Sequence, residues 1–245
     1  GSECPEGAFF YSENRHSQLV RLCESSQRPL IGCQRTMPVN SPVSVPCLGI
    51  LSESMIVALA VTSNSRINVD ISRCQTCENG HILSILEKRL ESVSTKLSLD
   101  LNQKIRLIDD KHQAEAKHHE VGRRTFFKEL NQIIGRSVSH RKDSQGANRV
   151  LTFSQKKQTV SLELIAYALS CAGEELRERI LQGFCMAVIR DKNCSLCGKC
   201  AAICPTGALK LTRDGADKRH LFNFLLCSGC GLCRDFCGNQ ALALV

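Results

Sequence analysis

The chain has 245 residues, 42% of them hydrophobic, and its 32 basic and 24 acidic side chains give a formal net charge of +8. This hydrophobic fraction suffices for a packed core, so the composition excludes a wholly disordered chain. The longest apolar stretch, near residues 54–61, is far shorter than the roughly 20 residues of a membrane span, so no transmembrane segment is expected. The unusual feature is the sixteen cysteines, because eight of them lie in the last 52 residues.

The first 28 residues contain a Cys-Pro sequence that has a counterpart near the other end of the chain. Residues 4–9 read CPEGAF, and residues 204–209 read CPTGAL. Residues 1–28 are therefore predicted to be the remnant of an upstream copy of the later segment. The alternative is that Cys4 and Pro5 form a turn that resembles it by chance.

Residues 29–90 alternate between short apolar runs and polar turns. The predicted elements are strands at 29–33 and 43–47, a helix at 55–61 with Ser52 as its N-cap, a strand at 67–71 and a helix from about residue 79. Strands that alternate with helices in this way predict a small parallel α/β unit.

Four cysteines follow the strands of this unit. They are Cys33, Cys47, Cys74 and Cys77. Because the carboxyl ends of parallel strands meet at one edge of a sheet, where ligands bind, we expect these thiols to converge. They are candidates for an additional [2Fe–2S] or [4Fe–4S] cluster. Zinc binding, buried thiols and a thioredoxin-like dithiol at Cys74 and Cys77 are the alternatives.

The sequence Val45-Pro46-Cys47-Leu48-Gly49, followed about 25 residues later by a pair of cysteines, is similar to the iron–sulfur delta subunit of hydrogenase–heterodisulfide reductase complexes. The resemblance covers about residues 29–90. It implies that these cysteines hold a [2Fe–2S] cluster that passes electrons between larger subunits.

The segment 91–185 is predicted to be mainly helical. Apolar residues recur every three or four positions from Leu86 to Ile108, which predicts a long amphipathic helix with a break near residues 98–99 or near Gly122. His112, His118 and His119 lie in a polar stretch and are expected on a solvated face. A linker is predicted near 139–158, followed by helices at 162–172 and 174–185. Cys171 lies among apolar residues and is expected to be buried.

The last part of the chain contains two runs of closely spaced cysteines. Cys194-x2-Cys197-x2-Cys200-x3-Cys204-Pro205 places four thiols within eleven residues, and residues 227–244 repeat the pattern at an offset of 33. Nine of the eighteen aligned positions are identical, including all four cysteines. Such crowding argues against a disulfide framework and against separated zinc knuckles, and three thiolates on one tight loop are typical of an iron–sulfur cluster.

Residues 186–245 resemble a bacterial ferredoxin domain with two [4Fe–4S] clusters. The resemblance implies crosswise ligation, in which the fourth cysteine of each run binds the other cluster. One cluster would then be held by Cys194, Cys197, Cys200 and Cys237, and the other by Cys227, Cys230, Cys233 and Cys204. Residues 4–9 would by the same resemblance end a further ferredoxin run.

The elements predicted around the two runs agree with this pseudo-symmetric domain. They are strands at 186–190, 208–211, 220–224 and 241–245, with short helices that begin at Gly198 and Gly231. The fold class predicted for the whole chain is therefore α+β, with a small parallel α/β unit, a helical middle segment and a C-terminal two-cluster domain.

No catalytic constellation and no phosphate-binding glycine loop is evident, so we expect an electron-transfer protein that serves a redox partner or the subunits of an oxidoreductase complex. The first alternative is a redox enzyme that binds a substrate or thiol at Cys74 and Cys77. The second is a sensory iron–sulfur protein that binds nucleic acid. Eight thiolates around two oxidised cluster cores would lower the net charge to about +4, so nucleic acid is not expected as a partner. Unpaired cysteines and oxygen-sensitive clusters favour the cytoplasm of an anaerobic microbe.

Overall fold

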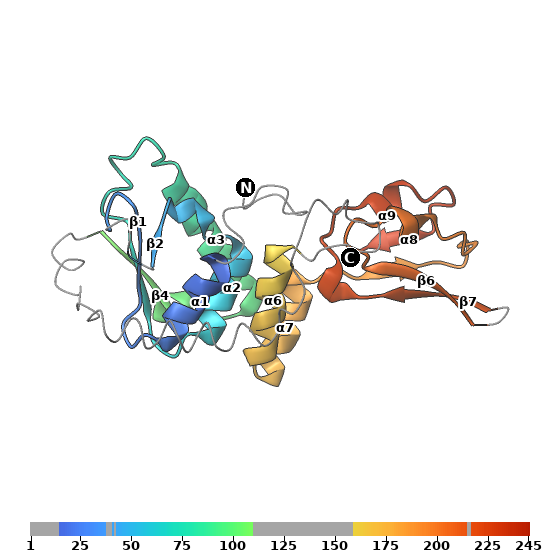
Figure 1. Cartoon of the computed structure of the whole chain (residues 1–245), viewed down its shortest axis with the longest axis horizontal. Coiled ribbons are helices and arrows are strands. Elements are labelled where there is room, and N and C mark those ends of the chain that lie inside the picture. The colour runs from blue at the N-terminus through green and yellow to red at the C-terminus, as the bar shows by residue number, and fades with distance from the viewer. Residues whose placement is uncertain (1–14, 38–40, 42, 110–158, 215–216) are drawn as a thin grey trace, which may run out of the picture. The chain divides into compact units, whose positions relative to one another are not determined.

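The computed structural model describes residues 15–37, 41, 43–109, 159–214 and 217–245 (Figure 1). The predictions for residues 1–14 and for most of 110–158, including the three histidines and the linker, lie outside these residues. The described chain combines a four-stranded parallel sheet, two small antiparallel sheets and helices. This mixture confirms the predicted α+β class.

The parallel sheet has the strand order β2-β1-β3-β4. Its strands are β1 (Leu30–Cys33), β2 (Ser44–Val45), β3 (Ile67–Asp70) and β4 (Ile105–Ile108). In the register of β1 and β3, Ile31 is opposite Val69, and both side chains are buried. The chain passes from β1 to β2 on one side and then returns to β3 on the other side of β1. The carboxyl ends of β1 and β3 therefore flank a topological switch point, where α/β sheets bind ligands.

Five helices complete the core around this sheet. They are α1 (Arg15–Ser25), α2 (Glu53–Thr62), α3 (Ile82–Leu97), α6 (Val160–Cys171) and α7 (Glu174–Phe184). Helix α2 contacts α1, α3 and α6, and α7 packs against α3 and α6. The core around the sheet therefore contains residues that precede position 29 in the sequence and residues that follow position 90.

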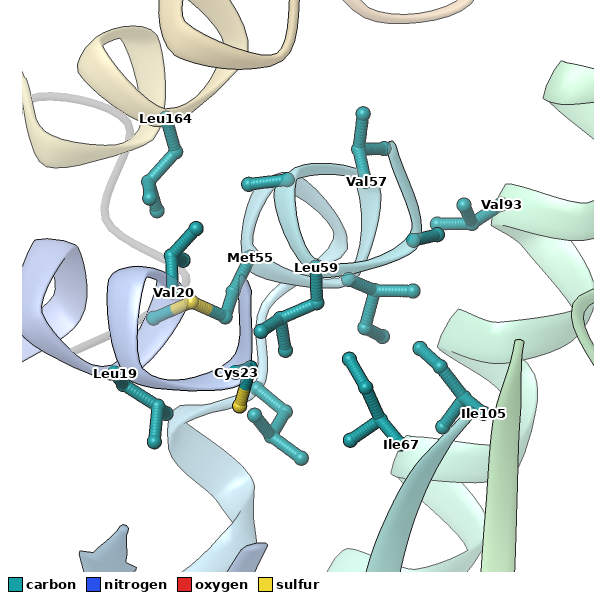
Figure 2. Close-up of a cluster of buried hydrophobic side chains, with 14 of the residues drawn as sticks. Leu19, Val20, Cys23, Met55, Val57, Leu59, Ile67, Val93, Ile105 and Leu164 are labelled. Atoms are coloured by element: carbon teal, nitrogen blue, oxygen red, sulfur yellow. The ribbon is translucent and has the colours of Figure 1, made fainter. Parts of the chain in front are cut away.

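Helix α2 is the centre of this packing. Its residues Met55 to Ala60 are all buried, because other elements cover the helix on several sides. Figure 2 shows Met55 and Leu59 of α2 between side chains of α1, such as Val20, and Ile67 of the sheet. The predicted N-cap is confirmed, since the Ser52 hydroxyl accepts a hydrogen bond from the backbone N–H of Met55 at 3.3 Å.

Two predictions for the middle of the chain are wrong. The predicted break near residues 98–99 is confirmed, since helix α3 ends at Leu97 with Ser98 in a left-handed conformation. The apolar residues Ile105 and Ile108, however, belong to strand β4 rather than to a continued helix. The reason is that these residues complete the sheet beside β3, with Ile105 opposite Ile67. Cys171 is exposed rather than buried, because it lies in the last turn of α6 beyond the packed face.

The C-terminal part has its own small core. Strands β5 (Val188–Arg190) and β8 (Leu242–Leu244) pair antiparallel, as do β6 (Leu209–Asp214) and β7 (Asp217–Phe222). The short helices α8 (Lys199–Ile203) and α9 (Leu232–Asp235) follow Gly198 and Gly231, as predicted. The buried residues of its hydrophobic cluster are Cys200, Cys204, Ala208, Leu209, Cys233 and Leu242. Three of these six are cysteines, so the core forms around the predicted ligands.

None of the helices in the described part of the chain is long and apolar enough to cross a membrane.

Candidate metal centres

The two cysteine runs have the same backbone conformation as well as the same spacing. Positive φ angles occur at Leu196 and Gly198 in the first run, and at Gly229 and Gly231 in the second. A further pair, Gly207 and Gln240, also has positive φ angles at the offset of 33 residues. Left-handed residues within such turns point successive backbone N–H groups into one concavity, which is a common way to bind anionic groups and iron–sulfur clusters.

The cysteines predicted to hold the second cluster line one cavity. Cys204 from the end of the first run lies there with Cys227, Cys230 and Cys233 of the second run. The cavity has about 310 Å³ of empty space including its opening, and the rest of its lining is mainly apolar, with Val188, Leu209, Phe222 and Leu244 among the residues. The structure therefore brings together the four thiols of the crosswise set.

Hydrogen bonds between the two runs join the segments that carry the other crosswise set. The side chain of Asn239 donates to the backbone carbonyl of Asn193 at 2.9 Å, and the N–H of Asp191 donates to the carbonyl of Ala241 at 3.1 Å. These bonds hold the segment after Cys237 beside the start of the first run. Within that run, the charges of Cys194 and Cys197 add to the effect of burial and raise the pKa of the Cys200 thiol.

The thiols of the two runs differ in their environment. Burial raises the pKa of Cys200 and Cys233. Burial also opposes ionisation of Cys204, but hydrogen bonds from the backbone of Leu209 and the Thr206 hydroxyl outweigh it and lower the pKa of this thiol. A hydrogen bond from the backbone of Lys199 lowers the pKa of the exposed Cys197. Hydrogen bonds that stabilise a thiolate also favour its binding to iron.

Two polar side chains beside the sulfurs were not predicted from the sequence. The Thr206 Oγ1 lies 3.7 Å from the Sγ of Cys204, and the Nε2 of His220 lies 3.6 Å from the Sγ of Cys200. Burial, followed by the charge of Arg190, lowers the pKa of His220. Thr206 follows the Cys-Pro pair and could have been suspected, whereas His220 is brought to Cys200 by the β6–β7 hairpin and has no sequence signal.

The four front cysteines lie at the carboxyl edge of the parallel sheet. Cys33 is the last residue of β1, Cys47 directly precedes the 3-10 helix η1 (Leu48–Ile50), and Cys74 and Cys77 lie in the turns after β3. Burial, followed by repulsion from Cys33, Cys47 and Cys77, raises the pKa of Cys74 to about 11. The four thiols are thus close enough to interact, as the topology predicts.

The loops that carry these thiols are held by specific contacts. Arg89 of α3 donates to the carbonyls of Gly49 and Leu51, both at 3.0 Å, and so fixes the segment after Cys47. The N–H of Gly80 donates to the carbonyl of Cys77 at 2.8 Å, and a Cβ at position 80 would lie only 2.8 Å from the carbonyl oxygen of Cys74. The sequence did not single out Arg89 or Gly80.

Asp70 is a buried carboxyl group at the same edge, and it was also missed. It ends β3, is 3% exposed, and accepts a hydrogen bond from the N–H of Ser72 at 3.0 Å. Its charge adds to the repulsion on Cys74. The front site therefore combines four thiols with one carboxylate.

The described cysteines form no disulfides. Among the described residues, no three His, Cys, Asp or Glu side chains are arranged to hold a single metal ion. A mononuclear zinc site brings its sulfurs to about 2.3 Å from one ion, whereas the cysteines of a cubane bind separate irons and lie farther apart. Outside the sites, Cys23 is fully buried in the core, and burial raises its pKa to about 12.

The comparison with known families concerns the C-terminal part. Residues 187–210 match the family model of the 4Fe-4S binding domain. The C-terminal part binds at least one [4Fe–4S] cluster. The resemblance of residues 29–90 to the delta subunit of hydrogenase–heterodisulfide reductase complexes is not shown by these comparisons.

A segment of 57 residues is 40% identical to DNA-directed RNA polymerase subunit Rpo3 of Methanosarcina acetivorans. The alignment covers 23% of this chain and 21% of that protein, so the chain spans about a fifth of the length of the curated relative it matches. No solved structure matches the chain.

Proposed function

We propose that the protein is an iron–sulfur electron-transfer protein with two crosswise-bound [4Fe–4S] clusters and a third iron–sulfur centre at its front site. The observation that carries this proposal is the cavity in which Cys204 meets Cys227, Cys230 and Cys233. The family match over residues 187–210 supports the same chemistry. A bound cluster supplies one-electron transfer, and the chain supplies ligands, insulation and the local field.

The residues around the cysteines can provide this insulation and this local field. The apolar side chains that line the cavity limit the access of water to the sulfurs, and the left-handed turns aim backbone N–H groups at them. His220 contacts the Cys200 sulfur, but Cys200 is a proposed cluster ligand, so its thiol is not available as a nucleophile. Transfer of electrons to a partner, rather than bond chemistry, is the function that this arrangement supports.

The front site is proposed as the third centre. Its four cysteines come from three different strand ends at a topological switch point, and burial, followed by the charges of the other three thiols, raises the pKa of Cys74. Thiols that repel one another in the metal-free site are stabilised as thiolates once iron binds. The donor set of four thiols fits either a [2Fe–2S] or a [4Fe–4S] cluster.

The alternative of an enzyme that acts through Cys74 and Cys77 is less well supported. Reactive thiols in dithiol enzymes have lowered pKa values, because the thiolate is the nucleophile. At Cys74, burial and three neighbouring thiols raise the pKa to about 11 instead. Such a thiol is a poor nucleophile at neutral pH.

The proposed partner is a redox protein or the other subunits of an oxidoreductase complex, and nucleic acid is not proposed as a ligand. The name of the polymerase subunit describes that protein, and the short alignment does not extend its assembly to this chain. Oxygen-sensitive clusters and unpaired thiols are consistent with a reducing cytoplasm in an anaerobic organism.

Serine variants of single cysteines test the crosswise ligation in the anaerobically purified protein. EPR spectra of the reduced protein should show that Cys204→Ser alters the same signal as Cys230→Ser, and that Cys237→Ser alters the same signal as Cys197→Ser. Grouping of Cys204 with Cys197 would contradict the proposed ligand sets. Cys171→Ser is the matched control, because Cys171 is exposed and lies outside every proposed site.

A further inference from the structure

The side chain of His220 lies against a proposed cluster ligand. Its Nε2 is 3.6 Å from the Sγ of Cys200, which is the buried third cysteine of the first run. His220 belongs to β7 and is opposite Leu211 of β6, so the register of the hairpin fixes its position. The contact is therefore built by the strands and does not depend on a loop.

The ring has only one engaged nitrogen. Among the described residues, the buried Nδ1 of His220 has no hydrogen-bond partner. A thiolate at Cys200 carries no proton, so Nε2 must be the donor in this contact. The ring is thus held as a hydrogen-bond donor to the sulfur.

The corresponding position of the other half lacks such a donor. At the offset of 33 residues, His220 corresponds to Ala187, which has no polar side-chain atom. The second set of ligands has a different donor, because the Thr206 Oγ1 lies 3.7 Å from the Sγ of Cys204. The counterpart of Thr206 is Asn239, whose side-chain amide donates to the carbonyl of Asn193. In the first set a side-chain hydrogen bond from Ser195 also reaches the exposed Cys197, so His220 is the side-chain donor specific to the buried Cys200.

We propose that His220 tunes the reduction potential of the centre bound by Cys194, Cys197, Cys200 and Cys237, by donating a hydrogen bond from Nε2 to the Cys200 sulfur. Reduction adds negative charge to the iron–sulfur unit, so a donor to one of its sulfurs stabilises the reduced form and raises the potential. Thr206 has the same effect on the other centre through Cys204. This inference rests on the proposed function, since it needs both centres.

The test is an EPR-monitored redox titration of the full chain with its clusters. In His220→Phe, which keeps a ring but has no donor, one of the two C-terminal potentials should become more negative while the other stays unchanged. In Thr206→Val, the other potential should move. His220→Gln, whose side-chain amide can donate, should retain a potential closer to that of the wild type. If His220→Phe does not retain its iron, His220→Leu serves as the second donor-free variant.

Two results would overturn the inference while leaving the proposed function intact. One is a donor-free variant that keeps about eight C-terminal irons but has both potentials unchanged. The other is a shift of both potentials by the same amount, which would indicate a general change of structure. A wild-type protein with a single C-terminal cluster would instead refute the proposed function.

A spectroscopic measurement adds a readout that a merely structural role would not change. With histidine labelled with ¹⁵N, pulsed EPR of the reduced wild type should detect a ¹⁵N coupling to the first centre. The coupling should be absent in His220→Phe. Its persistence in that variant would show that another histidine is the donor and would overturn the assignment.

Discussion

Replacement of Gly80 by alanine should weaken the front metal centre without affecting the C-terminal clusters. A Cβ at this position would lie 2.8 Å from the carbonyl oxygen of Cys74 and 3.1 Å from that of Cys77. Ordinary contact begins at 3.4 Å, so the backbone that carries both thiols must shift by about 0.6 Å. Neither contact is with a flexible side chain that could simply move away.

The strain should weaken metal binding, because the backbone that must shift carries the thiols of Cys74 and Cys77. Overpacking of this kind costs about 1–3 kcal/mol, which corresponds to a loss of roughly five- to 150-fold in metal affinity. The assay is the iron that the front site retains during a challenge with a graded concentration of chelator, measured beside the unchanged EPR signals of the C-terminal clusters.

Gly173→Ala is the matched control for this experiment. Nothing lies within 4 Å of a Cβ at position 173, and this glycine precedes α7, far in sequence from the four front cysteines. Its metal content should equal that of the wild type. Its free energy of unfolding should fall by no more than about 1 kcal/mol, because Gly173 is the N-cap of α7 and alanine is a poorer N-cap residue. If Gly80→Ala retained the front iron as strongly as Gly173→Ala, the proposed role of the loop would be refuted.

Three further predictions concern the core, the front thiols and the unpaired cysteines. Leu59→Ala should lower the free energy of unfolding by about 2–5 kcal/mol, because Leu59 is 1% exposed at the centre of the core. Urea titration would measure this change, and an unchanged unfolding midpoint would contradict the packing. Because the pKa of Cys74 is raised to about 11, metal binding releases its proton, and this proton alone should make the affinity of the front site rise at least tenfold per pH unit between pH 7 and 9; a flat profile would count against the site. Iodoacetamide should modify the exposed Cys171 in the folded protein, but the buried Cys23 only after unfolding. Mass spectrometry would measure both reactions, and equal labelling of the two cysteines in the folded protein would contradict this difference in exposure.

The C-terminal part was largely predictable because its information is local. The spacing of the cysteines and the glycines at positions 198 and 231 determine the turns, and the short helices begin at those glycines, as expected. The same holds for Ser52, whose capping bond depends only on residues within one turn. Local chemistry of this kind can be seen in a single sequence.

The remaining features depend on contacts between distant segments. The apolar spacing of Ile105 and Ile108 fits one face of a helix, but pairing with β3 makes them a strand. The position of His220 beside Cys200 depends on the register of a hairpin, and the clamp of Arg89 on Gly49 joins residues 40 positions apart. The sequence placed the front cysteines at one edge of a sheet, but the switch point became visible only with the strand order.

Iron and sulfide analysis of a variant without the front ligands tests the central claim most directly. With Cys33, Cys47, Cys74 and Cys77 all replaced by serine, the anaerobically isolated protein should contain about eight irons and eight sulfides per chain, because two [4Fe–4S] clusters remain. Mössbauer spectra of this variant should contain only [4Fe–4S] signals. A content of about four irons and four sulfides in the fully loaded variant would mean a single C-terminal cluster and would contradict the account.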